Sequence, residues 1–306
     1  MSSVRKHGCL FSADLWCVIN SNSKLKNMKQ TIFITGASSG IGKATSLYFA
    51  AKGWNVIASM RNPEKENDLS VHENITLLKA DVNDYSSVNE AIRQGISKFG
   101  QIDVLLNNAG YGQQGIFEAI SNQKIREQFE VNVFGLMETT RAILPHFRER
   151  KSGTIINITS GAGRVTVPLV SVYAASKFAI EGFSEALSYE LDSQNIKVKI
   201  IEPGYIATPF YERAKADYAT DPELVDYNDF QADMNDLFSS FGAMKTATAE
   251  DVAETIFNAA TDGTFQLRYV IGPDLEQMIA LRDSSKDQDY VNTMRAQFMP
   301  NGFAKR

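Results

Sequence analysis

Short runs rich in β-branched and other apolar residues alternate with longer amphipathic stretches along most of this chain. Such runs predict buried strands, and the stretches between them have the length and apolar spacing of helices. Parallel strands need a crossover between them, so a repeated strand–helix order predicts a parallel sheet with helices on both faces. The predicted strands are residues 31–35, 56–60, 75–79, 103–107, 154–158, 198–201 and 267–271.

The fold class that follows is α/β, a Rossmann-type doubly wound and mostly parallel seven-stranded sheet with helices on both faces. A length of 306 residues suits one large domain. We expect this domain to span residues 28–306, with residues 1–27 as a disordered N-terminal extension. The predicted helices are residues 41–52, 85–99, 122–150, 172–191 and 249–260, and Pro145 is expected to bend or end the third of them.

Residues 209–246 break this alternation. They are rich in Asp, Tyr, Phe and Met and show no clear period. A long segment of this kind between regular elements is usually a functional lid or a disordered loop. In an enzyme it would cover the ligand, so we expect a substrate lid here.

The composition excludes several classes of function. The net charge is −5 and no basic cluster stands out, so nothing supports a nucleic-acid partner. No apolar run is long enough to span a membrane. The only cysteines are Cys9 and Cys17, so the domain that we expect from residue 28 onward does not depend on an internal disulfide, which fits a cytoplasmic location. The three histidines are scattered and have no metal-binding spacing, so we expect neither a metal site nor a Ser-His-Asp triad.

A glycine-rich turn stands between the first predicted strand and the first predicted helix. Its glycines are Gly36, Gly40 and Gly42, with the spacing G-x-x-x-G-x-G in place of the general G-x-G-x-x-G fingerprint. Glycine allows a tight turn and a close approach of backbone to a pyrophosphate, while the helix N-terminus offers free N–H groups. With a strand before it and a helix after it, this turn predicts a dinucleotide site.

The residue after the second predicted strand bears on the choice of dinucleotide. A site that prefers NAD places Asp or Glu near this point, where the carboxylate accepts hydrogen bonds from the ribose hydroxyls. This chain has Arg61 there, and arginine suits bidentate binding of a 2′-phosphate. We therefore expect NADP as the cofactor and regard NAD as the alternative.

Tyr173 and Lys177 are four residues apart, so both lie on one face of the predicted helix. A neighbouring ammonium favours the phenolate and is expected to lower the pKa of the tyrosine from its usual value of roughly 10. A tyrosine in that condition can exchange protons near neutral pH. Ser160 lies thirteen positions before the tyrosine and follows the fifth predicted strand.

Several motifs agree in order and spacing with one known family. The chain resembles the classical short-chain dehydrogenase/reductases from about residue 31 to residue 208, with weaker similarity to residue 273. It looks more similar to the steroid and retinol dehydrogenase branch than to the shorter acyl-carrier-protein reductases. The motifs are the glycine turn at 35–42, Asn107-Asn108-Ala109-Gly110, Asn132, Ser160, Tyr173 with Lys177, and Pro203-Gly204 with Thr208.

The resemblance implies a role for each of four catalytic residues. Tyr173 would be the general acid/base, and Ser160 the hydroxyl that binds the substrate carbonyl. Lys177 would lower the pKa of the tyrosine and bind the nicotinamide ribose. Asn132 would shape its helix so that a water can relay protons to the lysine.

The resemblance also implies a cofactor site and one departure from the family pattern. Many members that prefer NADP carry a second basic residue just before the second glycine, but this chain has Ser39 there. The cofactor-binding residues are expected to be Gly36, Ser38, Ser39, Gly40, Ile41, Gly42, Arg61, Asp81, Val82, Asn108, Ala109, Gly110, Tyr173, Lys177, Pro203, Gly204, Ile206 and Thr208.

Apolar residues near the catalytic groups predict a hydrophobic substrate. We expect the substrate to contact Ser160, Val165, Leu169, Tyr173 and Tyr205, and Phe210 and Tyr211 lie nearby in the sequence. The predicted activity is an NADP-dependent interconversion of an alcohol and a carbonyl on a small molecule. Two alternatives are a non-catalytic nucleotide-binding sensor or scaffold, and an epimerase or dehydratase on the same fold. By analogy with the family we expect a homodimer or homotetramer.

Overall fold

The structure is a computed structural model that describes residues 29–241 and 247–298. The extension expected at residues 1–27 therefore lies outside the described residues. Within them, seven strands form one sheet in the order β3-β2-β1-β4-β5-β6-β7, and every neighbouring pair is parallel. This confirms the predicted fold class. The strands are β1 (Thr31–Ile34), β2 (Asn55–Met60), β3 (Ile75–Lys79), β4 (Val104–Asn107), β5 (Gly153–Ile158), β6 (Ile196–Pro203) and β7 (Arg268–Ile271).

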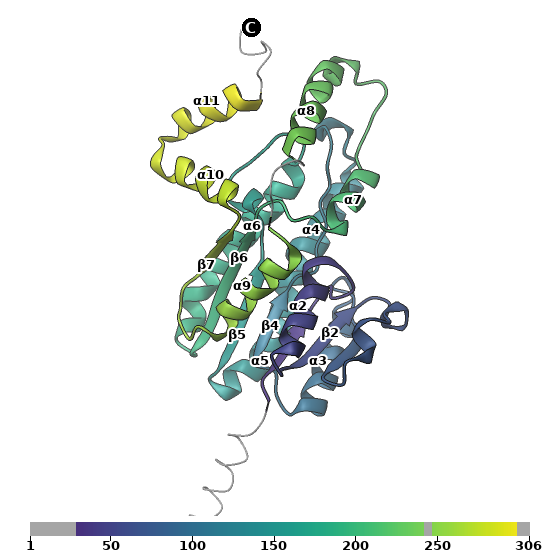
Figure 1. Ribbon diagram of the computed structural model, residues 1–306, viewed down its shortest axis with the longest axis vertical. Coiled ribbons are helices and arrows are strands. Elements are labelled where there is room, and N and C mark those ends of the chain that lie inside the picture. Colours follow the sequence, from purple (N-terminus) through teal and green to yellow (C-terminus); the bar gives the residue numbers. More distant parts are fainter. Residues whose placement is uncertain (1–28, 242–246, 299–306) are drawn as a thin grey trace, which may run out of the picture.

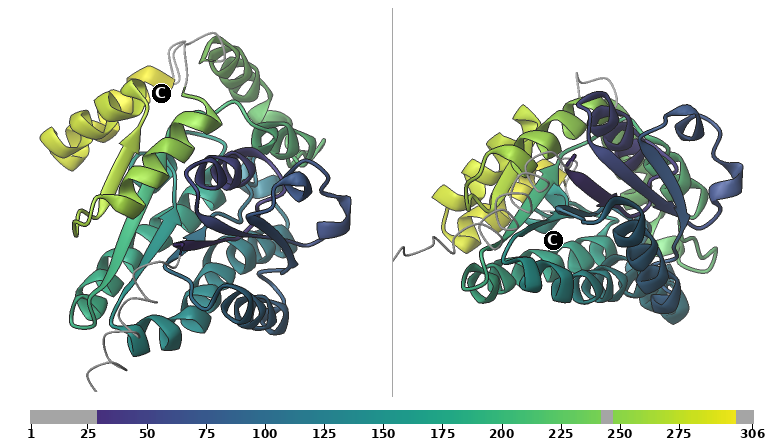
Figure 2. Two further views of the ribbon diagram at one scale, coloured as in Figure 1. Left: turned by 60° about the horizontal axis from the view of Figure 1, so that its bottom comes forward. Right: turned by 90° about the horizontal axis from the view of Figure 1, so that it is seen from below.

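Helices cover both faces of the sheet (Figure 2). Successive side chains of a strand point to opposite faces, and β1 shows this directly. Ile32 and Ile34 pack on one face in the same core cluster as Val252 and Ile256, while Phe33 packs on the other face with residues such as Phe147. The first face is covered by α2 (Gly40–Ala51) and α9 (Ala249–Thr261), and the second by α3 (Tyr85–Phe99), α5 (Gly135–Arg150) and α6 (Ser171–Asp192).

The helix predicted at residues 122–150 is interrupted at one point. It begins as α4 (Asn122–Phe129), passes through a π-helical turn η4 (Glu130–Phe134) and continues as α5. Pro145 lies inside α5 without ending it. A π turn is wider by one residue than an α turn, and such turns are frequent at functional sites. The change of helix type therefore falls at η4, and Pro145 does not end the helix.

Two pairs of helices stand beyond the carboxyl ends of β6 and β7 (Figure 1). One pair is α7 (Pro209–Ala216) and α8 (Asn228–Phe241), and the other is α10 (Pro273–Ser284) and α11 (Asp287–Phe298). Helices α8, α10 and α11 share an apolar cluster that includes Met234, Leu275 and Met294. The segment without a sequence period is thus largely helical between residues 209 and 241. Short 3₁₀ turns complete the chain at η1 (Pro63–Lys65), η2 (Leu69–Val71), η3 (Phe117–Ala119), η5 (Gly161–Gly163) and η6 (Val225–Tyr227).

Candidate active site

A cavity of about 570 Å³ opens at the carboxyl ends of the strands. The strand order reverses between β1 and β4, and ligands of open α/β sheets bind at such a switch point. The glycine turn follows β1 on one side of this point, and residues 108–110 follow β4 on the other. The cavity is lined by these predicted residues: Gly36, Ser38, Ser39, Gly40, Ile41, Arg61, Asp81, Val82, Asn108, Ala109, Gly110, Ser160, Tyr173, Lys177, Pro203, Gly204, Ile206 and Thr208.

The glycine turn is held against the β4 loop by a small hydrogen-bond network. The hydroxyl of Thr35 accepts bonds from the backbone N–H groups of Asn108 and Ala109, both at 3.0 Å. The Asn108 amide donates to the backbone oxygens of Thr35 at 2.9 Å and Gly36 at 3.0 Å. Gly36 has a φ of +66°, and a Cβ there would lie 2.8 Å from the Cα of Ala109. Only glycine fits this close approach.

The N-terminus of α2 faces the same cavity. Ser39 precedes the helix, but its side chain makes no capping bond, and no acidic residue stands in the first turn. The first N–H groups of a helix have no partner within it, and the helix dipole places positive charge there. Together with the close-packed turn, this arrangement fits the pyrophosphate of a dinucleotide. Gly42 does not line the cavity but packs behind the turn, where a Cβ would lie 2.5 Å from the Asn108 side-chain nitrogen.

Arg61 lies where the sequence predicts it, directly after β2 and at the cavity wall. Its side chain is exposed, and no ion pair engages it within the described part of the chain. Asp81 and Val82 follow β3 and line the adjoining wall. An uncompensated cation at this position suits an additional phosphate.

Tyr173 and Lys177 lie in the first two turns of α6, as the spacing predicts. The Lys177 ammonium is buried and donates to the backbone oxygen of Ile158 at 2.9 Å. Burial lowers the pKa of Lys177 to about 8, although the nearby Glu181 carboxylate raises it. The ammonium lies 5.7 Å from the centre of the Tyr173 ring.

The prediction that the pKa of Tyr173 is lowered is wrong. Burial raises the pKa of Tyr173 to about 12, and only its hydrogen bond with Ser160 lowers it. The Lys177 ammonium donates its hydrogen bond to Ile158 at the end of β5 and not to the phenol. Burial penalises the phenolate more than the surrounding groups stabilise it. The tyrosine is therefore a neutral phenol at neutral pH.

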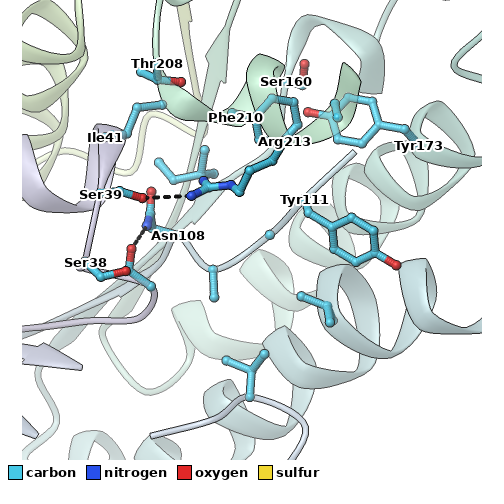
Figure 3. A pocket seen from close by; sticks show the side chains of 18 of the residues that line it. Ser38, Ser39, Ile41, Asn108, Tyr111, Ser160, Tyr173, Thr208, Phe210 and Arg213 are labelled. Carbon is cyan, nitrogen blue, oxygen red and sulfur yellow. Dashed lines mark hydrogen bonds between the residues drawn. The ribbon is translucent and has the colours of Figure 1, made fainter. Parts of the chain in front are cut away.

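Ser160 follows β5 and lies beside the hydroxyl end of Tyr173 (Figure 3). Its Oγ also accepts a bond from the N–H of Ala162 at 3.2 Å, which fixes the start of the 3₁₀ turn η5. Two hydroxyl donors, one from β5 and one from α6, thus meet at the same end of the cavity. Donors placed in this way stabilise negative charge that develops on a carbonyl oxygen.

Asn132 lies in the π turn and does not line the cavity. Its amide nitrogen donates to the Tyr111 backbone oxygen at 2.9 Å and to the Ser176 hydroxyl at 3.2 Å, and its oxygen accepts from the Tyr111 N–H at 3.1 Å. A Cβ on Gly110 would lie 3.2 Å from the Asn132 oxygen and 3.9 Å from the Lys177 nitrogen. Asn132 therefore joins the β4 loop to α6 close to the lysine.

Three predicted substrate residues lie elsewhere. Val165 and Leu169 are buried in the apolar cluster beneath α8, α10 and α11 and do not line the cavity. Tyr205 is 38% exposed, and its ring packs at 4.3 Å from that of Tyr211, again outside the cavity. The helices that cover Val165 and Leu169 were not predicted from the sequence. Without them, the two side chains were expected to contact the ligand.

Helix α7 supplies further cavity residues, of which the sequence indicated only Phe210 and Tyr211 and missed Arg213 and Ala214. Phe210 packs on the catalytic end, with its ring centre 5.7 Å from that of Tyr173. Proline after Thr208 is a helix-start signal that could have revealed α7. The other α7 side chains at the cavity are Tyr211, Arg213 and Ala214, and Asp217 follows them at the end of the helix.

The comparisons with known proteins agree with this geometry. Residues 30–219 match the short chain dehydrogenase family. The chain belongs to the short-chain dehydrogenase/reductase family. This places it among nucleotide-binding oxidoreductases that act on the CH–OH group of donors, and it confirms the resemblance drawn from the motifs.

Three relatives of this short-chain dehydrogenase are informative. An uncharacterized oxidoreductase of Schizosaccharomyces pombe is 40% identical over 240 residues, which are 78% of this chain and 99% of the relative. A 3-ketodihydrosphingosine reductase of Bacteroides thetaiotaomicron is 40% identical over 59% of this chain and 65% of its own length. Human retinol dehydrogenase 8 is 33% identical over 78% of this chain and 80% of its own length.

Solved structures share the fold of this short-chain dehydrogenase. A short-chain dehydrogenase from Streptomyces avermitilis superposes with a TM-score of 0.73 at 29% identity, covering 91% of this chain and 99% of that one. The protein ElxO with NADP bound gives a TM-score of 0.69 at 29% identity, covering 82% of this chain and 100% of that one. Across residues 29–241 and 247–298, no helix has the length and apolar character needed to cross a membrane.

Proposed function

We propose that this short-chain dehydrogenase uses NADP(H) to interconvert a carbonyl and an alcohol on a hydrophobic small molecule. The observation that carries the proposal is the convergence of Ser160, Tyr173 and Lys177 at one end of a single cavity. The glycine turn and Arg61 line the other part of that cavity. A dinucleotide that binds this turn would place its nicotinamide near the catalytic groups, where it supplies the hydride.

Ser160 and Tyr173 have different roles at the substrate carbonyl. The Ser160 hydroxyl and the Tyr173 phenol donate hydrogen bonds to the carbonyl oxygen, where negative charge develops during reduction. Tyr173 then passes its proton to that oxygen. Because its pKa is raised to about 12, it carries this proton throughout the neutral range.

Lys177 and Asn132 support the proton donor. The Lys177 ammonium binds the nicotinamide ribose and stabilises the phenolate after proton transfer. Its pKa of about 8 leaves it largely protonated at pH 7. Asn132 positions α6 through its bonds to Tyr111 and Ser176. The other cofactor contacts are those predicted from the sequence, since all of them except Gly42 line the cavity.

The preference for NADP over NAD rests on charge. No carboxylate occupies the end of β2, where Arg61 lies without an ion-pair partner among the described residues. A 2′-phosphate would supply the missing negative charge. The NADP-bound structure of ElxO, which is 29% identical to this chain, supports the same preference.

The hydrophobic character of the substrate rests on α7 and on the relatives. Phe210 and Tyr211 present rings to the catalytic end of the cavity. The names retinol dehydrogenase and 3-ketodihydrosphingosine reductase describe enzymes of lipid-like alcohols and ketones. We propose that α7 and α8, within the predicted lid at 209–246, cover such a substrate, although residues 242–246 lie outside the described part of the chain.

The test is an activity screen with NADPH and NADH against two substrate panels. One panel holds long-chain and polyene ketones and aldehydes, and the other holds small polar sugars. We expect NADPH oxidation with the first panel. Turnover of sugars alone would overturn the substrate class, and faster turnover with NADH would overturn the cofactor preference.

A further inference from the structure

One cation of α7 reaches across the cavity to the glycine turn. The Arg213 side chain donates from Nη1 to the hydroxyl of Ser39 at 3.3 Å, although the two residues are 174 positions apart (Figure 3). Ser39 precedes the first residue of α2. The guanidinium therefore lies against the part of the cavity wall that fits the phosphates of a dinucleotide.

Arg213 has no counter-charge at this position. It forms no ion pair with any residue in the ranges 29–241 and 247–298, and the first turn of α2 contains no acidic residue. Asp217, an acidic residue of the same cavity wall, is already bound by Lys124 at 2.8 Å. The Arg213 side chain is exposed and lies beside a positive helix end, so an anion bound between them would interact favourably with both.

We propose that Arg213 binds a phosphate of the dinucleotide and thereby ties α7 to the bound cofactor. The proposal rests on the dinucleotide site of the proposed function and adds a binding residue from outside the glycine turn. The acceptor is either the pyrophosphate or the 2′-phosphate, since a guanidinium binds both with the same bidentate chemistry. Ser39 itself carries no charge, so the cation at this point of the turn comes from α7.

The same helix face links this contact to the catalytic end. Phe210 and Arg213 are three residues apart on α7 and therefore neighbours on its surface. Phe210 packs on Tyr173, while Arg213 contacts the glycine turn. The start of the helix is close to the turn as well, since a Cβ on Gly40 would lie 3.4 Å from that of Thr208. A phosphate held by Arg213 thus fixes the helix that covers the proton donor.

The first experiment measures binding of NADPH and of NADH to the full chain by calorimetry, without substrate. Arg213→Gln removes the charge, and Lys215→Gln removes a charge from the same helix outside the cavity. We expect Arg213→Gln to weaken NADPH binding about 10- to 100-fold, the range for a charge-assisted hydrogen bond, and Lys215→Gln to leave it within about 2-fold. Circular dichroism checks that both variants fold.

The two cofactors identify the phosphate that Arg213 binds. An equal loss of NADPH and NADH affinity in Arg213→Gln places the arginine on the pyrophosphate, and a loss for NADPH alone places it on the 2′-phosphate. Unchanged affinity for both, with a wild type that binds them, overturns the inference and leaves the proposed function intact. A wild type that binds neither dinucleotide overturns the proposed function as well.

The second experiment tests the tie to α7 by backbone hydrogen exchange. Saturating NADPH should slow exchange in residues 209–216 of the wild type and of Lys215→Gln. In Arg213→Gln at equal cofactor saturation, the same segment should exchange as fast as it does without cofactor. Equal protection in this variant and the wild type would show that the arginine does not hold the helix.

Discussion

The side-chain nitrogen of Lys177 lies 2.9 Å from the backbone oxygen of Ile158, at the end of β5. The ammonium is thus fixed by the sheet and not by the phenol one turn away. Its burial lowers the pKa of Lys177 to about 8. The buried Lys177 ammonium lies at the cavity, where it can stabilise a phenolate or donate a hydrogen bond to a ribose hydroxyl.

This buried cation should reduce the stability of the fold. The pKa of Lys177 is lower in the folded protein than in the unfolded chain, where it is 10.5, so the unfolded state binds more protons between pH 8 and 10.5. The contribution of Lys177 to the free energy of unfolding is therefore most unfavourable below pH 8, and it becomes less unfavourable as the pH rises to 10.5. Lys177→Met should raise the free energy of unfolding at pH 7 by on the order of 1 kcal/mol.

Urea unfolding at pH 7 and pH 9.5 measures this effect. The advantage of Lys177→Met over the wild type should shrink at the higher pH. A variant that is less stable than the wild type at pH 7 would show that the bond to Ile158 outweighs the desolvation of the charge.

Removal of the Ser160 hydroxyl should slow the chemical step. Ser160→Ala deletes one of two donors to the carbonyl oxygen, and the loss of such a donor typically costs about 10²- to 10³-fold in kcat. Affinity for NADPH should not change. Ser193→Ala, at the exposed C-terminal end of α6, is the matched control and should keep full activity. A kcat for Ser160→Ala within about 2-fold of the wild type would remove Ser160 from the mechanism.

Glycine at position 36 should be required for the fold of the turn. Gly36→Ala combines a φ of +66° with a Cβ 2.8 Å from the Cα of Ala109, so it should cost on the order of 2–3 kcal/mol. Gly182→Ala is the control, because nothing lies within 4 Å of its Cβ in α6 and alanine favours a helix by up to about 1 kcal/mol. Thermal melts should show opposite shifts, and a neutral Gly36→Ala would contradict the described turn.

A buried carboxylate near the end of β6 should make stability depend on pH. Glu202 is fully buried near Glu181, Arg164 and Arg268. Burial, together with the Glu181 charge, raises the pKa of Glu202 to about 7 from 4.5, although both arginines lower it. Because the folded state binds the extra proton, this group stabilises the fold below pH 4.5 and loses that contribution as the pH rises through 7.

Glu202→Gln tests this dependence, because glutamine does not titrate. The free energy of unfolding of the wild type, relative to that of the variant, should fall between pH 5 and pH 8. Urea unfolding at both values gives this difference directly. A difference that rises with pH would mean that the arginines hold Glu202 charged throughout the range.

Much of the sheet could be predicted from the sequence because its strands are short and apolar on both faces. The predicted bounds of β3 and α3 agree with the structure at both ends. The apolar pattern of residues 122–150 did not reveal the π turn at Glu130–Phe134. The turn positions Asn132 for hydrogen bonds to Tyr111 and Ser176. These bonds join separate elements, so the sequence of one helix does not reveal them.

The substrate end of the site was harder to predict for a related reason. Helices α8, α10 and α11 form one apolar cluster with the loop after Ser160. That packing buries Val165 and Leu169 away from the cavity, and the cavity is lined instead by α7. The role of residues 1–27, the cytoplasmic location and the homo-oligomer stay predictions.

The most direct test of the proposed function is NADPH oxidation by the wild type and by Tyr173→Phe on one hydrophobic ketone that the screen identifies. The variant keeps the ring against Phe210 but lacks the proton that the reduction needs. We expect kcat to fall by at least about 10²-fold, with NADPH affinity within about 2-fold of the wild type. Turnover by Tyr173→Phe at the wild-type rate would contradict the proposal that this phenol is the proton donor.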